Sequence, residues 1–251
     1  MGKERLDQVL VERGLASSRA RAKSLILLGA VLVDGEREDK AGTLVRSDAV
    51  IRITHNPQPY VSRGGLKLEK ALEFFGINPQ GKVAMDVGAS TGGFTDCLLQ
   101  KGARRVYAID VGYGQLAWKL QQDPRVINLQ RRNIRHLNRE EVGEEVDLAV
   151  IDSSFISLTL VIPSTLTFLR KGGELVALLK PQFEVGRGEV GKGGVVRDPE
   201  KHRQSVEKVL RFGEDIGLTL RGVMESPLRG PKGNREFFLY FESPHGENRG
   251  S

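Results

Sequence analysis

The chain has 251 residues, 28% of them charged and 39% hydrophobic, with a formal net charge of +6, a composition typical of soluble globular proteins. Its single cysteine, Cys97, excludes an internal disulfide and a metal site built from several cysteines, and we expect no metal ion. The sequence has neither an apolar run long enough to span a membrane nor the apolar segment of a secretory signal, which predicts a cytoplasmic protein without stable membrane association.

Residues 1–53 predict a small α+β domain. Apolar residues at helical spacing from Leu6 predict a short helix that Gly14 ends, and Ser17 or Ser18 can cap a second helix that stops at Gly29. The apolar period then changes from helical to alternating, which indicates strands. We expect these strands at residues 31–33 and 49–53, with a tight turn at residues 34–35.

Basic residues are concentrated in this first part of the chain, where residues 1–63 contain 11 Lys and Arg against 8 Asp and Glu. On the second helix, basic side chains form either an ordinary solvated face or a surface for a polyanion. The segment Arg5-Leu-Asp, together with residues 16–22 and 29–35, resembles the RNA-binding domain named after ribosomal protein S4. The resemblance implies that RNA, mainly through its phosphates, is bound by Arg5, Arg19, Arg21 and Lys23.

Residues 54–63 contain two prolines within three positions and no apolar period, which predicts a semi-rigid linker between two domains. From residue 64 to 243, strand and helix patterns alternate, which predicts an α/β domain with a mainly parallel, Rossmann-like sheet covered on both faces. Residues 244–251 predict a frayed tail. The seven strands are expected at residues 83–87, 105–110, 126–129, 147–151, 174–179, 219–224 and 237–241, and helices at residues 66–75, 95–100, 115–121 and 201–215.

A glycine loop, residues 86–93 with the sequence DVGASTGG, lies between the first strand of this sheet and a helix. This setting lets the backbone approach a nucleotide closely, because glycine has no side chain in the way. Asp110 ends the next strand, 22 residues after Gly88, and is either a ligand of a ribose diol or a simple strand-end cap. Ser90 replaces a glycine of the dinucleotide-binding pattern, which disfavours a dinucleotide. The candidate nucleotide-binding residues are Asp86, Gly88, Ser90, Thr91, Gly92, Gly93 and Asp110.

Two other enzyme classes share parts of these patterns. Residues 88–92 match the Gly-x-Ser-x-Gly turn of serine hydrolases, but a hydrolase also needs a later acid and histidine. His202 is expected on the solvated face of a helix, which disfavours it as the base. Residues 186–192 have the spacing of an NTPase phosphate loop, but Gly193 stands where a Ser or Thr would hold magnesium. We interpret residues 186–197 as a mobile, basic loop.

Polar side chains follow two of the predicted apolar strands. Asp152 comes directly after residues 147–151, and Lys180 directly after residues 174–179. Ligands of open parallel sheets bind outside the carboxyl ends of the strands, so both side chains are expected to face a site. Lys67, on a predicted helix, and Glu236, at the start of the last strand, are each explained as well by a surface position when taken alone.

Six segments together closely resemble the TlyA family of haemolysin-like ribosomal RNA 2′-O-methyltransferases, which have an FtsJ-like catalytic domain: residues 60–68, 86–95, 110–116, 152–157, 180–183 and 230–236. The resemblance implies the seven-stranded sheet of an S-adenosylmethionine-dependent methyltransferase, with ribosomal RNA or ribosomal subunits as partners. Ser153 departs from the larger or apolar residue expected in many relatives. The resemblance also implies a Lys-Asp-Lys-Glu tetrad, with its second member touching the cofactor as well: Lys67, Asp152, Lys180 and Glu236.

The reaction implied by the resemblance is attack of a ribose 2′-hydroxyl on the sulfonium methyl group of S-adenosylmethionine. Lys180 is the candidate either to take the hydroxyl proton or to orient the hydroxyl and stabilise its developing charge, and both roles stay open. Methylation of a base amino group is disfavoured, because Ser153 and Ser154 stand where such enzymes have Pro-Pro after the acid. Cys97 lies within a predicted helix, which disfavours it as the nucleophile of a carbon methylase.

Two functions without methyl transfer also stay open. Relatives of the TlyA family are often named haemolysins, so a membrane-lysing protein is one alternative, although the sequence contains no long amphipathic membrane helix. The other alternative is a catalytically inactive, RNA-binding factor for ribosome assembly. No pattern in the sequence indicates the oligomeric state or the nucleotide that would be modified.

Overall fold

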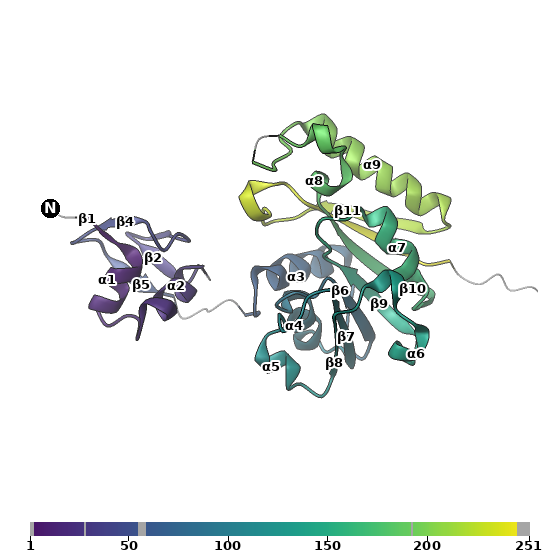
Figure 1. Cartoon of the computed structure of the whole chain (residues 1–251), viewed down its shortest axis with the longest axis horizontal. Coiled ribbons are helices and arrows are strands. Elements are labelled where there is room, and N and C mark those ends of the chain that lie inside the picture. Colours follow the sequence, from purple (N-terminus) through teal and green to yellow (C-terminus); the bar gives the residue numbers. More distant parts are fainter. Residues whose placement is uncertain (1–2, 28, 55–58, 192, 245–251) are drawn as a thin grey trace, which may run out of the picture. The chain divides into compact units, whose positions relative to one another are not determined.

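The computed structural model describes residues 3–27, 29–54, 59–191 and 193–244. The chain divides into two compact units, Met1–Arg63 and Gly64–Ser251, each with its own core (Figure 1). Four positions of the expected linker, residues 55–58, lie outside the described residues, and so do residues 245–251 of the expected tail.

The N-terminal unit is built from two helices and two small sheets. Strands β2 and β5 pair antiparallel, as expected, and β3 joins β2 through a turn in which Asp34 and Gly35 have φ angles of 52° and 89°. Gly29, at φ 64°, follows the second helix in the expected left-handed conformation. The elements are β1 (Lys3–Arg5), α1 (Leu6–Glu12), α2 (Arg19–Leu27), β2 (Val31–Val33), β3 (Glu36–Arg37), β4 (Leu44–Arg46) and β5 (Ile51–Ile53).

The pairing of β1 with β4 was not predicted from the sequence. Both strands have three residues, and β1 consists of Lys3, Glu4 and Arg5, all exposed. A strand without alternating apolar residues gives no periodic signal, so only the long-range pairing reveals it.

The C-terminal unit contains a seven-stranded sheet in the order β11-β12-β10-β9-β6-β7-β8. The strands pair parallel from β10 to β8, whereas β12 is antiparallel to both of its neighbours. Each of the seven predicted strands is confirmed within a few residues, except that β10 starts five residues earlier. The strands are β6 (Val83–Val87), β7 (Arg105–Asp110), β8 (Val126–Gln130), β9 (Val146–Ile151), β10 (Leu169–Leu179), β11 (Thr219–Glu225) and β12 (Phe237–Glu242).

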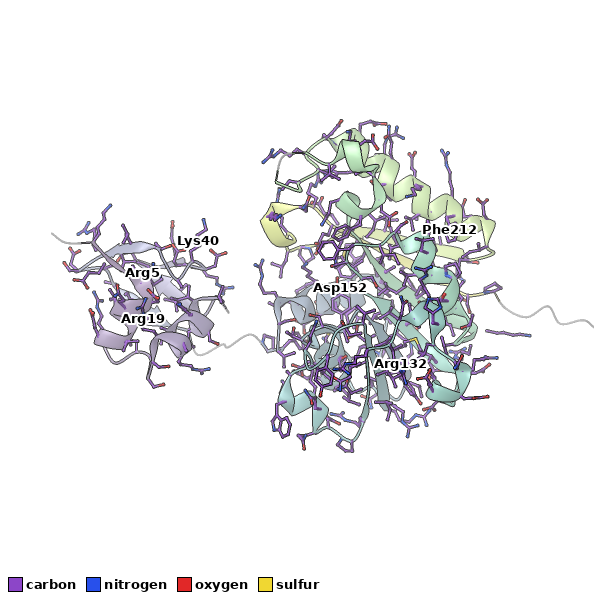
Figure 2. All side chains as sticks on the ribbon, in the orientation of Figure 1. Arg5, Arg19, Lys40, Arg132, Asp152 and Phe212 are labelled. Carbon is purple, nitrogen blue, oxygen red and sulfur yellow. The ribbon has the colours of Figure 1, made fainter. Side chains whose placement is uncertain are left out.

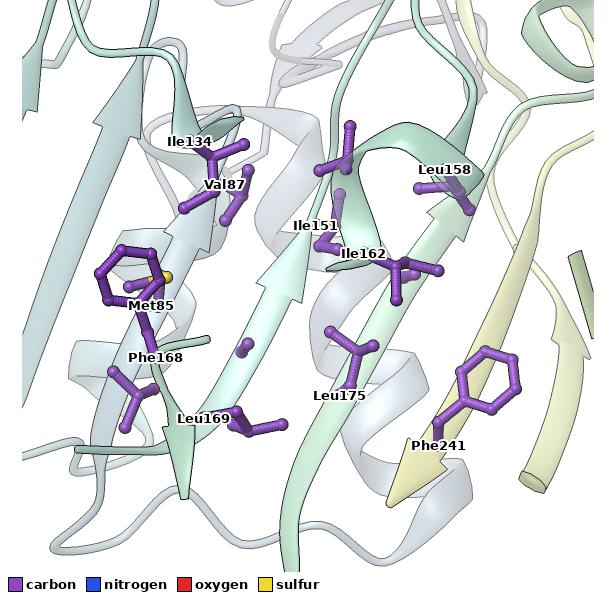
Figure 3. Packing of buried hydrophobic residues seen from close by; sticks show 14 of the residues in the cluster. Met85, Val87, Ile134, Ile151, Leu158, Ile162, Phe168, Leu169, Leu175 and Phe241 are labelled. Carbon is purple, nitrogen blue, oxygen red and sulfur yellow. The ribbon is translucent and has the colours of Figure 1, made fainter. Parts of the chain in front are cut away.

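Helices cover both faces of this sheet, as predicted. On one face, apolar residues of α7 and α9 pack against odd-numbered positions of the strands, including Met85, Ile151, Leu175 and Phe241 (Figure 3). On the opposite face, the α4 ring of Phe94 lies 6.2 Å from that of Phe238 in β12. The helices are α3 (Arg63–Phe75), α4 (Gly93–Gln100), α5 (Trp118–Gln121), α6 (Arg139–Val142), α7 (Leu158–Leu166), α8 (Pro181–Glu184) and α9 (Pro199–Asp215), with short 3-10 turns η1 (Ile134–His136), η2 (Arg187–Glu189) and η3 (Pro231–Gly233).

The strand order creates a crevice at the carboxyl ends of β6 and β9. From β6 the chain builds outward to β7 and β8, and then crosses to the other side of β6 to form β9. Because of this reversal, the loops that follow β6 and β9 lead away from each other and leave a gap between them. Ligands of open α/β sheets bind at such a point. Among the residues that the structure describes, no helix is long and apolar enough to cross a membrane.

Candidate active site

The glycine loop lies directly against the carboxyl end of β9. Gly88 has a φ angle of 90°, and a Cβ atom at this position would lie 2.8 Å from the backbone oxygen of Asp152. The Asp152 amide donates a hydrogen bond to the Val87 carbonyl, with 2.9 Å between the heavy atoms. Glycine is therefore required at position 88 because the loop packs closely against the carboxyl end of β9. This reason is separate from any close approach of the loop to a ligand.

The carboxylate of Asp86, the first residue of the glycine loop, is fully buried. Its Oδ2 atom accepts hydrogen bonds from the Thr95 amide, at 2.9 Å, and the Thr95 hydroxyl, at 2.7 Å. Within the described part of the chain, its Oδ1 atom has no hydrogen-bond partner. Burial raises the pKa of Asp86 to about 7, against the hydrogen bonds from Thr95, which lower it. Asp86 thus has one buried oxygen whose capacity to accept a hydrogen bond is unused among the described residues.

The raised pKa of Asp86 predicts a pH-dependent stability. The pKa in the folded protein lies above the ordinary value of about 3.9, so the folded state favours the protonated form of Asp86. The contribution of protonated Asp86 to the unfolding free energy is therefore complete below pH 4 and is lost as the pH rises through 7. The unfolding free energy of Asp86→Asn relative to the wild type should therefore rise between about pH 4 and pH 7, by on the order of 4 kcal/mol.

Urea denaturation followed by circular dichroism at several pH values, without added ligand, measures this difference. Asp123→Asn is a suitable control, because Arg125 lowers the pKa of Asp123. The unfolding free energy of that variant relative to the wild type should not change between pH 5 and pH 7. A flat difference for Asp86→Asn would show that Asp86 is ionised throughout this range.

Asp110 ends β7 and holds the glycine loop in place. Its Oδ2 atom accepts a hydrogen bond from the Ser90 amide, at 2.8 Å, and its Oδ1 atom accepts one from the Gly112 amide, at 2.7 Å. Each carboxylate oxygen can accept more than one hydrogen bond. Asp110 therefore fixes the loop and retains acceptor capacity toward the crevice.

A cavity of about 450 Å³ occupies the crevice between the ends of β6, β7 and β9. Its size is within the range of small-molecule sites. Four predicted site residues line it: Gly88, Ser90, Asp110 and Asp152. The other predicted nucleotide-binding residues are not among those that line it: Asp86, Thr91, Gly92 and Gly93.

The segment after β8 also lines this cavity, and the sequence analysis missed it. Arg132, Asn133 and Ile134 contribute to the wall, and the side chain of Asn133 caps η1 by accepting a hydrogen bond from the Arg135 amide. The signal was available, because these residues follow a predicted strand as Asp110 and Asp152 do. Thr95, which binds Asp86, was noted only as part of a motif and a helix.

Two ion pairs, one buried and one partly buried, join the members of the tetrad. Lys67 Nζ in α3 lies 2.5 Å from Glu236 Oε2, and Lys180 Nζ lies 2.6 Å from Asp152 Oδ1. Lys180 also donates a hydrogen bond to the Ser154 hydroxyl, at 2.9 Å. Burial of charged groups is costly unless they are paired, and each of these four side chains has an opposite charge as its partner.

The strand register explains why the two ion pairs lie at the same edge of the sheet. Leu179 of β10 pairs with Phe237 of β12, so Lys180 and Glu236 occupy the next position of these neighbouring strands. Glu236 is 1% exposed, and its Oε1 atom has no hydrogen-bond partner among the described residues. Lys67 and Glu236 are both buried, so the surface alternative applies to neither, and a contact across 169 positions joins them.

Two loops meet at the turn before Glu236. The Asn234 side chain donates a hydrogen bond to the Gly194 carbonyl, at 2.9 Å, and accepts one from the Val196 amide, at 3.0 Å. Asn234 is buried, so it fastens the end of the expected basic loop, residues 186–197, to this turn. Residues 186–192 have the spacing of an NTPase phosphate loop, but they lead into a short antiparallel bridge between Gly191 and Val195 and not into a helix.

His202 is buried, and its predicted solvated position is wrong. The first turn of α9 packs toward residue Val196, whose carbonyl is 2.8 Å from His202 Nε2. The ring also lies 6.0 Å from that of Phe237. No histidine is among the described residues that line the cavity at Ser90, so the serine-hydrolase interpretation gains no base from the structure.

In the N-terminal unit, the four predicted RNA-binding residues divide into two pairs. Arg5 and Arg19 both form ion pairs with the buried carboxylate of Asp7. Arg21 and Lys23 are exposed on α2 and form no ion pair within the described ranges. All four side chains remain at least partly accessible to a polyanion.

Comparison with known proteins agrees with this architecture. Residues 60–243 match the model of the FtsJ-like methyltransferases, and residues 4–51 match the S4 domain. The chain is 49% identical to the 16S/23S rRNA (cytidine-2′-O)-methyltransferase TlyA of Mycobacterium tuberculosis, over 95% of this chain and 90% of that protein. It is 40% identical to Hemolysin A of Brachyspira hyodysenteriae, over 94% of this chain and 99% of that protein.

A solved structure from Streptococcus thermophilus, provisionally named a hemolysin, shares 42% identity and covers 99% of this chain and 92% of its own, with a TM-score of 0.76. The similarity extends through both units and includes methyltransferases and proteins with hemolysin names alike. The chain therefore belongs to the TlyA family, in which an S4 domain precedes an FtsJ-like methyltransferase domain.

Proposed function

We propose that this methyltransferase transfers the methyl group of S-adenosylmethionine to a ribose 2′-hydroxyl of ribosomal RNA. The observation that carries the proposal is the presence of two ion pairs, the buried Lys67 with Glu236 and the partly buried Lys180 with Asp152, at the carboxyl edge of the sheet. A hydroxyl group that attacks a methyl donor must be aligned and must lose its proton, and charged groups fixed beside a cavity favour both events. Because ribosomes are in the cytoplasm, the proposed activity takes place there.

The residues of the cavity fit S-adenosylmethionine. Asp110 has acceptor capacity for a ribose diol, and the unpartnered Oδ1 atom of Asp86 suits a donor or cationic group. Asp152 lies on the cavity wall and binds Lys180, so it joins the cofactor site to the tetrad. When bound, the cofactor supplies an electrophilic methyl group on a sulfonium.

Lys180 is the proposed contact of the attacking hydroxyl. A protonated lysine has three N–H donors; Ser154 accepts a hydrogen bond from one of them, and the Asp152 carboxylate lies 2.6 Å from the nitrogen as an ion-pair partner. A remaining N–H donor can hold the ribose oxygen and stabilise the negative charge that develops on it. In the neutral state, the same nitrogen would accept the hydroxyl proton instead. A rate of methyl transfer that rises with pH favours the second role, and a rate independent of pH favours the first.

The relation to TlyA supports ribosomal RNA as the substrate, because that protein is named a 16S/23S rRNA (cytidine-2′-O)-methyltransferase. The S4 domain and its four basic residues support RNA binding through phosphates. We expect the RNA affinity to fall steeply when the salt concentration is raised, because each neutralised phosphate releases counterions. Filter binding of ribosomal RNA between 50 and 200 mM salt measures the slope, on the order of one per phosphate contacted. Salt-independent binding would contradict phosphate contacts.

The decisive experiment incubates the purified protein with tritiated S-adenosylmethionine and either free ribosomal RNA or isolated ribosomal subunits. The proposal predicts label on a ribose 2′-oxygen, mapped by nuclease digestion and mass spectrometry. Label on a base would contradict it. RNA binding without any methyl transfer would favour the inactive assembly factor, and lysis of erythrocytes by protein free of cofactor and RNA would favour the function that the hemolysin names of relatives suggest.

A further inference from the structure

A fully buried carboxylate in the N-terminal unit lies beneath two arginines, Arg5 and Arg19. Asp7, in the first turn of α1, is 0% exposed and is flanked by the core residue Leu6. Burial of a carboxylate among apolar side chains costs free energy, and replacing a buried ion pair by apolar residues is often neutral or stabilising. An acid at this position therefore requires cationic partners that offset the cost of its burial.

Asp7 binds two guanidinium groups that come from different elements. Arg5 Nε lies 3.0 Å from Asp7 Oδ1, and one terminal nitrogen of Arg5 lies 3.3 Å from Oδ2. A terminal nitrogen of Arg19, the first residue of α2, lies 3.0 Å from the same Oδ2 atom. The hydrogen bonds from Arg5 and Arg19 lower the pKa of Asp7 to about 2, so the carboxylate stays charged at neutral pH.

The two arginines are held at one end and open to solvent at the other. The side chain of Arg5 is 45% exposed and that of Arg19 is 54% exposed, and both lie on the N-terminal unit in Figure 2. A guanidinium has five N–H donors, and Asp7 engages two from Arg5 and one from Arg19. Most donors of this cluster of two cations and one anion are therefore free to bind an external anion.

We propose that Asp7 is a positioning residue that fixes Arg5 and Arg19 as a preformed clamp for an RNA phosphate. This inference rests on the proposed RNA binding by the N-terminal unit. An unrestrained arginine loses substantial rotamer freedom when it binds a ligand, and this loss of entropy opposes binding. Asp7 imposes that order before the RNA arrives, and the planar guanidinium groups then present paired donors to phosphate oxygens.

The sign of one substitution distinguishes positioning from simple charge. Asp7→Asn removes a negative charge from the RNA-binding unit, so an electrostatic account predicts tighter RNA binding. The positioning account predicts weaker binding, because the asparagine amide donates hydrogen bonds and cannot hold both guanidinium groups as the carboxylate does. We expect the affinity of the full-length Asp7→Asn protein for ribosomal RNA to fall about tenfold at constant salt.

Asp48→Asn is the matched control. Asp48 belongs to the same unit and also pairs with an arginine, Arg46, but its side chain is 47% exposed. Neutralising it should leave the RNA affinity unchanged or raise it. Arg5→Lys and Arg19→Lys keep the charge and remove the planar fork, and each should weaken binding in the wild-type background more than in the Asp7→Asn background.

Thermal melting by circular dichroism keeps the test valid if Asp7→Asn is less stable, because all affinities are compared well below the lowest melting temperature. RNA binding by Asp7→Asn that equals or exceeds that of the wild type would overturn the inference alone. So would Arg5→Lys and Arg19→Lys effects that are the same in both backgrounds. Failure of the wild-type protein to bind ribosomal RNA would instead overturn the proposed function on which the inference rests.

Discussion

Replacement of Lys180 by alanine should lower the rate of methyl transfer by about 10²–10⁴-fold, the range for loss of one acid–base or charge-stabilising group. Lys180 Nζ is the only tetrad nitrogen that contacts Asp152 among the described residues, and it sits directly after β10 at the sheet edge. Lys180 is not among the residues that line the cavity, so we expect the cofactor affinity to change little. Single-turnover transfer from tritiated S-adenosylmethionine measures the rate, and calorimetry measures the affinity.

Lys171→Ala provides the control for the loss of a positive charge. Lys171 lies on the same strand, β10, but is exposed and near the opposite end of the strand from Lys180. Its variant should retain the wild-type rate. A Lys180→Ala protein that is folded, binds cofactor and RNA, and still transfers methyl groups at the wild-type rate would remove Lys180 from the proposed mechanism.

Gly230→Ala should reduce methyl transfer by about 100-fold, although the substitution adds only one carbon atom. A Cβ atom at residue 230 would lie 1.9 Å from Glu236 Oε1 and 2.7 Å from Glu236 Cδ. Glu236 is 1% exposed and must move away from this carbon, which displaces the carboxylate that pairs with Lys67. The φ angle of Gly230 is −68°, so the alanine introduces no backbone strain of its own.

Gly188→Ala is the matched control, because a Cβ atom at that position meets no other atom within 4 Å. Its rate should equal that of the wild type. Melting curves of both variants separate a local change at Glu236 from general unfolding. If folded Gly230→Ala protein transfers methyl groups at the full rate, the position of the Glu236 carboxylate is not required for the reaction.

The sequence predicted those parts of the fold that have a local signal. The seven strands of the large sheet are apolar and are separated by glycine or polar turns, so their positions could be read directly. Asp152 and Lys180 could be assigned to a site because a parallel sheet presents the ends of its strands at one edge. Lys67 and Glu236 entered the candidate site only through the family resemblance, since neither residue has a local pattern that distinguishes it from a surface residue.

The features that the sequence did not predict depend on contacts between distant segments. Asp7 seemed to be part of a short motif, and only the fold places Arg19 on the same carboxylate as Arg5. His202 has the helical position of a solvated residue, but a loop residue, Val196, covers it. Hydrophobic periodicity describes which side of an element is apolar, and it carries no information about which polar group will meet another.

The position of β12 within the sheet has a consequence for biosynthesis. β12 lies between β10 and β11, and the residue before it, Glu236, is the partner of Lys67. Among the described strands, β12 is also the last to leave a translating ribosome. Until it emerges, β11 has no neighbouring strand in the sheet and Lys67 has no ion-pair partner. A nascent chain therefore contains its complete S4 domain long before the tetrad exists, and a premature stop codon before residue 236 would yield a fragment with the S4 domain but without the proposed catalytic site.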